Sequence, residues 1–128
     1  MKSITPKEYR ELIAKQKKSK KYRNTVVEYD GNTFDSIKER DYYIELKLKQ
    51  KAGIVKDIFC QVPILIEVNC IKICKYYCDF KIIYSDKSIE YVDIKAFDKK
   101  NNKYITTPAF QLKKKLVKAV HGIDIKIV

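Results

Sequence analysis

The sequence lacks any long apolar run, and this absence excludes one class of protein. The longest apolar stretch, residues 62–66, is far shorter than the roughly 20 residues of a membrane-spanning helix. It is also too short for the apolar region of a signal peptide. The start of the chain is polar and basic. We therefore expect a cytoplasmic protein without a membrane partner, whose cysteines stay reduced.

Glycine and proline are scarce, with three of each, so each one marks a particular place. Thr5-Pro6 followed by Glu8 is typical of a helix start, because threonine caps and proline suits the first helical position. We expect a basic helix to about residue 18. Asp30-Gly31 predicts a hairpin between strands at 25–29 and 32–34.

Ser36 and Glu39 form a second capping-box pattern and predict a helix that Gly53 ends. Its expected apolar face carries Ile37, Ile44 and Leu48. Alternation of Val, Ile, Tyr and Phe then predicts strands near 58–67, 71–84 and 88–95, with Pro63 at an edge or bulge.

A polar loop at 98–102 precedes a helix that begins at Thr107-Pro108 and runs to Gly122. A last strand at 123–128 completes the order α-β-β-β-α-β. This order predicts an α/β protein, more closely an α+β mixed sheet with helices packed on it. We expect a basic N-terminal helix or arm at 1–23 and a single domain at 24–128.

Acidic residues are few, 16 against 28 Lys and Arg, and the formal net charge is +12. The excess is uneven: residues 1–23 hold nine basic and two acidic residues, a net +7, which leaves +5 for the other 105 residues. Such asymmetry favours a polyanionic partner, nucleic acid or an anionic membrane surface. The alternative is a solvated basic face that keeps the protein soluble.

The chain also lacks a C-x-x-C pair, which disfavours a cysteine metal cluster. Cys70, Cys74 and Cys78 in one extended strand would be roughly 13 Å apart at each step. We expect these three and Cys60 to be reduced, mostly buried thiols. His121, the one histidine, precedes Gly122 at a helix end and is interpreted as a C-terminal cap interaction rather than a catalytic base.

Three charged residues fall on the two predicted strands that flank Ser85-Asp86-Lys87. If those three residues form the loop, Tyr84 faces Ser88 and Asp79 faces Asp93. Facing residues share a side of the sheet, with Cβ atoms roughly 4.5–5.5 Å apart. Lys95, two residues beyond Asp93, points to that same side. Opposed like charges destabilise a sheet, so the pattern calls for a compensating partner.

A divalent cation would provide that compensation, because paired carboxylates and water are what Mg²⁺ accepts. An ammonium beside the metal can hold a hydroxide and stabilise charge on a phosphate. The set therefore fits phosphodiester hydrolysis with Mg²⁺ or Mn²⁺. The alternative is an exposed strand pair with Lys95 bridging Asp79 or Asp93.

The chain resembles the PD-(D/E)xK nuclease superfamily, and more closely a phage and prophage family of small Holliday-junction-resolvase-like proteins. The matching pieces span about residues 21–125, and their order and spacing carry the resemblance. They are Lys21-Tyr22-Arg23-Asn24, Gly31, Phe34-Asp35-Ser36, Glu39, Gln61-Val62-Pro63, Asp79-Phe80, Val92-Asp93-Ile94-Lys95, Thr107, Phe110, Leu112 and Lys113.

The resemblance implies a restriction-endonuclease-like core in which Asp79 and Asp93 are metal ligands and Lys95 is the catalytic lysine. It also implies that Glu39 completes the catalytic and metal site, although a helix cap alone would explain that residue. Two departures stand out. Cys78 replaces the proline that names the superfamily's first motif, and Ala96 stands where the family usually has glycine.

Further residues are candidates for DNA binding. Lys113 and Gln111 open the last helix, where the superfamily places a polar residue near the scissile phosphate; a solvated face is the alternative. In the basic arm, phosphate contacts are expected from Lys17, Lys18, Lys20, Lys21 and Arg23. The alternative for the arm is a solubilising extension.

The sequence predicts a metal-dependent DNA endonuclease. By the resemblance, this enzyme is selective for branched DNA and acts in phage recombination, replication or packaging. It would be encoded by a phage or prophage, act in the bacterial cytoplasm and form a homodimer. No organic cofactor or small-molecule substrate is expected. The alternatives are a nicking or flap nuclease without junction preference and a non-catalytic DNA-binding accessory protein.

Overall fold

The computed structural model describes residues 5–7 and 26–128. It divides into two compact units, Met1–Arg40 and Asp41–Val128, which are described one at a time. Pro6 and Lys7 are helical, at the helix start that the sequence predicts. The rest of that helix to residue 18, the strand start at Thr25 and the domain boundary at residue 23 lie outside the described residues.

The first unit contains a short hairpin, as the Asp30-Gly31 pair predicts. Strand β1 (Val27–Tyr29) is antiparallel to β2 (Asn32–Phe34). Asp30 and Gly31 have φ angles of 54° and 76°, the left-handed values that a two-residue hairpin turn requires.

Helix α2 (Ile37–Lys51) begins in the first unit and continues into the second. Its start is capped as predicted: the Ser36 hydroxyl accepts the Glu39 backbone N–H at 3.1 Å. After the helix, Gly53 has the positive φ, 81°, expected of a terminating glycine.

The predicted apolar face of α2 is wrong. Ile37 and Leu48 are 48% and 61% exposed, whereas Tyr43 and Leu46 are buried. Tyr42 and Tyr43 determine which side of α2 faces the core, because an aromatic ring buries more apolar area than an aliphatic side chain. Tyr42 and Tyr43 both pack on Phe80, with ring centroids 5.5 and 6.4 Å apart.

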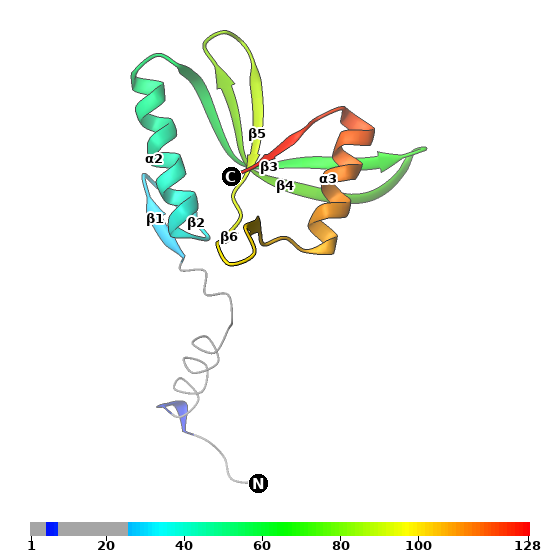
Figure 1. The fold of residues 1–128 in the computed structure, drawn as a ribbon, viewed down its shortest axis with the longest axis horizontal. Helices are drawn as coiled ribbons and strands as arrows, with labels where there is room; N and C mark the ends of the chain where they lie inside the picture. The colour runs from blue at the N-terminus through cyan, green and yellow to red at the C-terminus, as the bar shows by residue number, and fades with distance from the viewer. Residues whose placement is uncertain (1–4, 8–25) are drawn as a thin grey trace. The chain divides into compact units, whose positions relative to one another are not determined.

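A four-stranded mixed sheet with order β3-β4-β5-β8 forms the centre of the second unit. Strands β3 (Val55–Val68), β4 (Ile71–Tyr84) and β5 (Ile89–Asp93) are antiparallel neighbours, and β8 (Ile125–Ile127) runs parallel to β5. Pro63 lies in β3, an edge strand, as expected. The protein is thus mixed α+β with the predicted order of core elements (Figure 1).

The side-chain alternation of β4 changes partner at Asp79. Cys78 packs in the cluster beneath helix α3 (Pro108–His121), whereas Phe80, two residues on, packs against Tyr42 and Tyr43 of α2. In a regular strand such residues share one face. The β3–β4 pairing runs from Cys60–Phe80 to Val62–Cys78 across Gln61, which has a φ of 51°. The change of packing partner along β4 therefore coincides with the irregular backbone at Gln61.

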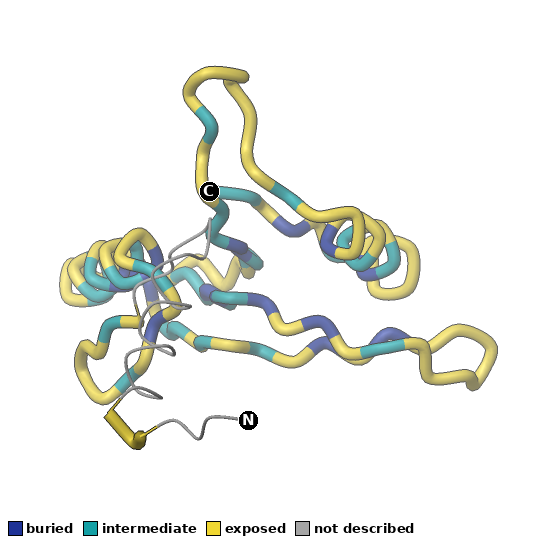
Figure 2. Tube along the Cα trace, turned by 90° about the horizontal axis from the view of Figure 1, so that it is seen from below, coloured by how far each residue is buried: buried dark blue, intermediate teal, exposed yellow. Residues whose placement is uncertain are grey.

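Helix α3 is fixed at both ends as the sequence predicts. The Thr107 hydroxyl accepts the Phe110 N–H at 3.1 Å, and Gly122 ends the helix in the left-handed conformation with a φ of 69°. Phe110 and Val117 are buried against β3, β4 and β8. Figure 2 shows the long β3–β4 hairpin continuing past this buried region to an exposed tip.

Three smaller expectations are corrected. The loop 98–102 is the turn of a short hairpin between β6 (Phe97–Asp98) and β7 (Lys103–Tyr104). The His121 ring does not serve as a helix cap, because its Nε2 lies 2.6 Å from the Leu65 carbonyl oxygen of β3. The four cysteines form no disulfide, but only Cys78 is buried: Cys60 and Cys74 are half-buried, and Cys70, in the β3–β4 turn, is exposed.

Within residues 5–7 and 26–128, no helix is long and apolar enough to cross a membrane.

Candidate active site

The turn between β4 and β5 fixes the register that the sequence predicts. The Tyr84 N–H donates to the Ser88 carbonyl at 2.9 Å, and the pairs run from Ile83–Ile89 to Phe80–Val92. The next residues along the two strands are Asp79 and Asp93. The two acids therefore meet where the β4–β5 pairing ends.

Asp93 is a buried acid, 4% exposed, at the end of β5. Its Oδ2 accepts a hydrogen bond from the Tyr76 hydroxyl of β4. The Lys95 ammonium lies 3.6 Å from the same oxygen. A buried carboxylate is costly unless it is paired and hydrogen-bonded, and these two side chains supply both forms of compensation.

Asp79 reaches across the end of the β4–β5 pair. Its Oδ2 accepts the Ile94 backbone N–H at 2.9 Å, and its Oδ1 accepts the Gln61 side-chain amide at 3.1 Å. Ile94 lies between Asp93 and Lys95 in the chain, so this bond holds the Asp79 carboxylate beside both residues. The structure thus brings Asp79, Asp93 and Lys95 together.

Lys95 is held by its backbone as well as by its charge. Its N–H donates to the Val128 carbonyl, and the Val128 N–H donates to the Asp93 carbonyl, both at 3.0 Å. Its Nζ lies 4.1 Å from the centre of the Phe110 ring, a cation–π contact. The side chain remains 26% exposed, so the ammonium is oriented yet open to an incoming anion.

The charges of Asp79 and Asp93 raise the pKa values of two neighbouring side chains, Tyr76 and Cys78. Burial, the hydrogen bond to Asp93 and the charges of Asp93 and Asp79 all raise the pKa of the Tyr76 hydroxyl far above its usual range. Burial raises the pKa of the Cys78 thiol to about 12, and the two carboxylates add to this shift. Tyr76 and Cys78 therefore stay protonated at neutral pH, and negative charge is concentrated around them.

This donor set fits a divalent cation that keeps most of its water. Two carboxylates with water ligands suit Mg²⁺, which is often bound through one or two protein carboxylates. Within residues 5–7 and 26–128, no group of three or more His, Cys, Asp or Glu side chains is arranged to hold a metal ion. The candidate metal site is the Asp79–Asp93 pair with Lys95.

Glu39 belongs to the first unit and is 5% exposed. Its backbone N–H is bound by Ser36, as its role in a helix cap requires. Its role in the metal site stays a prediction.

The predicted DNA-binding residues fall into two groups. Gln111 donates from its side-chain amide to the Thr106 hydroxyl at 2.8 Å and lines a pocket together with Lys114 and Lys115. Lys113 is half-buried and does not line that pocket. The five residues of the basic arm, Lys17, Lys18, Lys20, Lys21 and Arg23, lie outside the described residues.

Sequence reasoning missed two residues of the site, Tyr76 and Gln61. Gln61 appears in the resemblance without a role, and the structure shows it holding Asp79. Tyr76 contacts Asp93 although regular alternation would not place it on the same side as Asp79. Ala96, where the resemblance has glycine, is not among the described residues with positive φ, so its backbone path does not require glycine.

The comparisons with known proteins give one match. A family model described as "Protein of unknown function (DUF1064)" matches residues 19–126, most of the chain. No curated protein and no solved structure matches the sequence.

We predict that Tyr76→Phe destabilises the fold by about 1–3 kcal/mol, because it removes a donor from the buried Asp93 oxygen while leaving the ring in place. Urea unfolding measures the change. Tyr77→Phe is the matched control, since Tyr77 is 56% exposed and its loss of a hydroxyl should change stability by less than about 0.5 kcal/mol. Equal effects of the two substitutions would show that the Tyr76–Asp93 bond contributes nothing.

Proposed function

This chain belongs to the DUF1064 family, and we propose that it is a divalent-metal-dependent endonuclease that hydrolyses DNA phosphodiester bonds. One observation carries the proposal: a buried and a half-buried carboxylate meet beside a partly exposed lysine at the end of β5. Two acids beside one base carry a formal net negative charge, which a bound divalent cation would balance.

In this proposal, Asp79 and Asp93 hold the metal ion, Mg²⁺ or Mn²⁺. When bound, the ion would lower the pKa of a water ligand and neutralise negative charge on the phosphate. The hydrogen bonds from Gln61 and the Ile94 amide orient the Asp79 carboxylate, and Tyr76 orients that of Asp93. Such fixed partners keep ligands in place and are typical of metal sites.

Lys95 has the role of binding the developing negative charge on the phosphate. Its Nζ is kept near Asp93 and the Phe110 ring, so it needs little reorganisation when a phosphate arrives. A preoriented charge in a partly desolvated site stabilises a transition state more than a mobile one.

The substrate class comes from charge and from the resemblance. A formal net charge of +12 suits a polyanion, and the resemblance to junction-resolving nucleases favours branched DNA. It also favours a homodimer that cuts two strands symmetrically, in the bacterial cytoplasm, encoded by a phage or prophage. The lysines and arginine of residues 17–23 would add contacts to the phosphate backbone.

We predict that the protein cleaves a synthetic four-way junction with Mg²⁺ and not with EDTA. Asp93→Asn and Lys95→Ala should each lower the single-turnover rate by about 100-fold or more, the cost of removing a preoriented charged group. DNA affinity should change little for Lys95→Ala, because its role lies in the transition state.

The controls are Glu90→Gln and Lys126→Ala, which remove one acid and one base from an ion pair elsewhere on β5 and β8. Both should retain wild-type cleavage. Binding of the junction by the wild type without cleavage in Mg²⁺ or Mn²⁺ would contradict an endonuclease and support a DNA-binding accessory protein.

We predict that Glu39→Gln separates a catalytic role from a structural one. Glutamine can serve a capping box as glutamate does, so the start of α2 should be preserved and urea unfolding should show a transition close to that of the wild type. Cleavage should fall at least tenfold, a barrier increase of about 1.4 kcal/mol, because a metal ligand or base needs the charge. Glu45→Gln, at an exposed position of α2, is the control. Full activity of Glu39→Gln would show that Glu39 only caps the helix and has no catalytic role.

A further inference from the structure

A pocket of about 610 Å³ opens between α3, β8 and the segment that follows β7. Phe110, Ile125 and Ile127 give it apolar walls, and Tyr104 and Thr106 line its side. Phe110 and Ile125 are buried, and Tyr104 is 37% exposed. The volume lies within the range of pockets that hold a small molecule or a single building block of a polymer.

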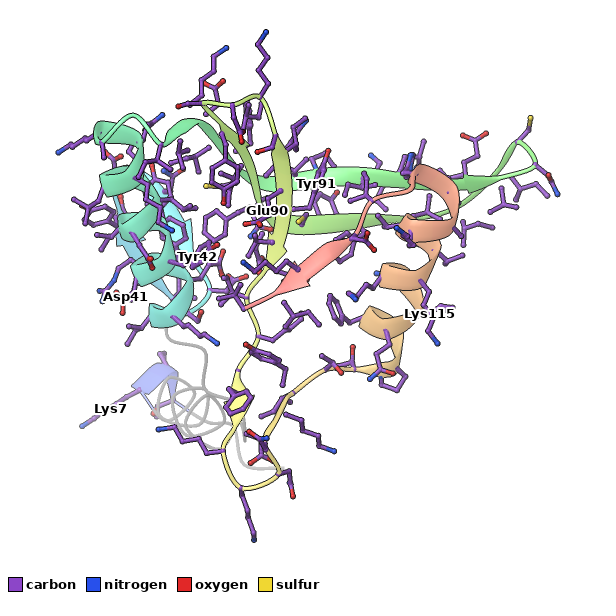
Figure 3. All side chains as sticks on the ribbon, turned by 45° about the horizontal axis from the view of Figure 1, so that its top comes forward. Lys7, Asp41, Tyr42, Glu90, Tyr91 and Lys115 are labelled. Atoms are coloured by element: carbon purple, nitrogen blue, oxygen red, sulfur yellow. The ribbon has the colours of Figure 1, made fainter. Side chains whose placement is uncertain are left out.

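The residues that line this pocket carry a net positive charge. Lys114, Lys115 and Lys118 line it from one side of α3, and Asp124 is its single acid. Asp124 is neutralised by Lys118 at 2.8 Å. Lys114 and Lys115 therefore leave a net positive charge beside apolar and aromatic walls; Figure 3 shows Lys115 on α3. An occupant with a flat apolar part and an anionic part matches this lining.

The pocket adjoins the candidate active site through two shared residues. The Phe110 ring lines the pocket and also lies beneath the Lys95 ammonium. Ile127 lines it as well and is the ladder partner of Asp93. An occupant of the pocket would thus lie next to a phosphate bound at Lys95.

We propose that this α3–β8 pocket holds one unpaired nucleotide of the DNA substrate, adjacent to the phosphate that is cut. The inference rests on the proposed endonuclease function and narrows its substrate. A base can enter a pocket and stack on aromatic side chains only when it is outside the duplex. The substrate class is then DNA with an unpaired nucleotide beside the cleavage point, as at a branch or flap.

In this arrangement the base lies against the apolar wall and Tyr104, and Lys114 and Lys115 contact its phosphates. Gln111, fixed at the pocket by its bond to Thr106, is placed to contact the base edge. Fully paired DNA would use Lys95 and the metal ligands but would leave the pocket without a base.

The test compares binding of two DNAs by the wild-type protein in EDTA, so that no cleavage occurs. One is a linear duplex and the other is the same sequence with a short single-stranded flap. Lys114→Ala/Lys115→Ala should weaken flap binding at least tenfold more than duplex binding. The matched control is Lys72→Ala/Lys75→Ala, which removes the same charge from exposed positions of β4. It should weaken binding of the flap and of the duplex by the same factor.

A second measurement locates the base. A flap with 5-iododeoxyuridine at its unpaired junction nucleotide should photocrosslink to Tyr104, as identified by peptide mass spectrometry, and Tyr104→Leu should remove that crosslink. An equal loss of affinity for both DNAs in Lys114→Ala/Lys115→Ala, or crosslinks confined to other segments, would overturn the pocket proposal.

Cleavage assays with Mg²⁺ keep the two proposals apart. Selective flap binding and a Tyr104 crosslink without any cleavage would uphold the pocket and refute the endonuclease. Metal-dependent cleavage without flap selectivity or crosslink would uphold the endonuclease and refute the pocket.

Discussion

Burial of the Asp93 carboxylate is the constraint on which the rest of the site depends. At 4% exposure, a negative charge must have partners that compensate for its lost hydration. The Tyr76 hydroxyl and the Lys95 ammonium are these partners. Lys95 in turn rests over Phe110, so the position of α3 is tied to the position of the acid.

One of the irregularities of the long hairpin lies beside Asp79, at Gln61. At Gln61 the backbone takes a left-handed φ of 51°, which typically costs about 1–3 kcal/mol for a residue other than glycine. Beyond this point Tyr76 and Cys78 pack beneath α3, whereas Phe80 packs against α2. The same Gln61 holds Asp79 through its side chain. Gln61 thus has a strained backbone and also positions the carboxylate of Asp79.

Much of this arrangement could be predicted from local signals. The Ser85-Asp86-Lys87 turn sets the β4–β5 register, and the Thr107 and Gly122 caps bound α3, because both depend on short-range backbone geometry. The burial of Tyr43 and Leu46 in place of Ile37 and Leu48 could not be predicted, because ring packing on Phe80 decided which side of α2 is buried. The Tyr76–Asp93 bond and the pocket beside Phe110 also escaped prediction, because each joins segments that only the folded sheet brings together.

A crystal structure grown with Mn²⁺ would show whether Asp79 and Asp93 form one metal site. We expect one anomalous peak within roughly 2.0–2.3 Å of a carboxylate oxygen from each aspartate, as for oxygen ligands of such ions. The absence of a peak at saturating Mn²⁺, or a peak bound to only one of the two acids, would contradict it.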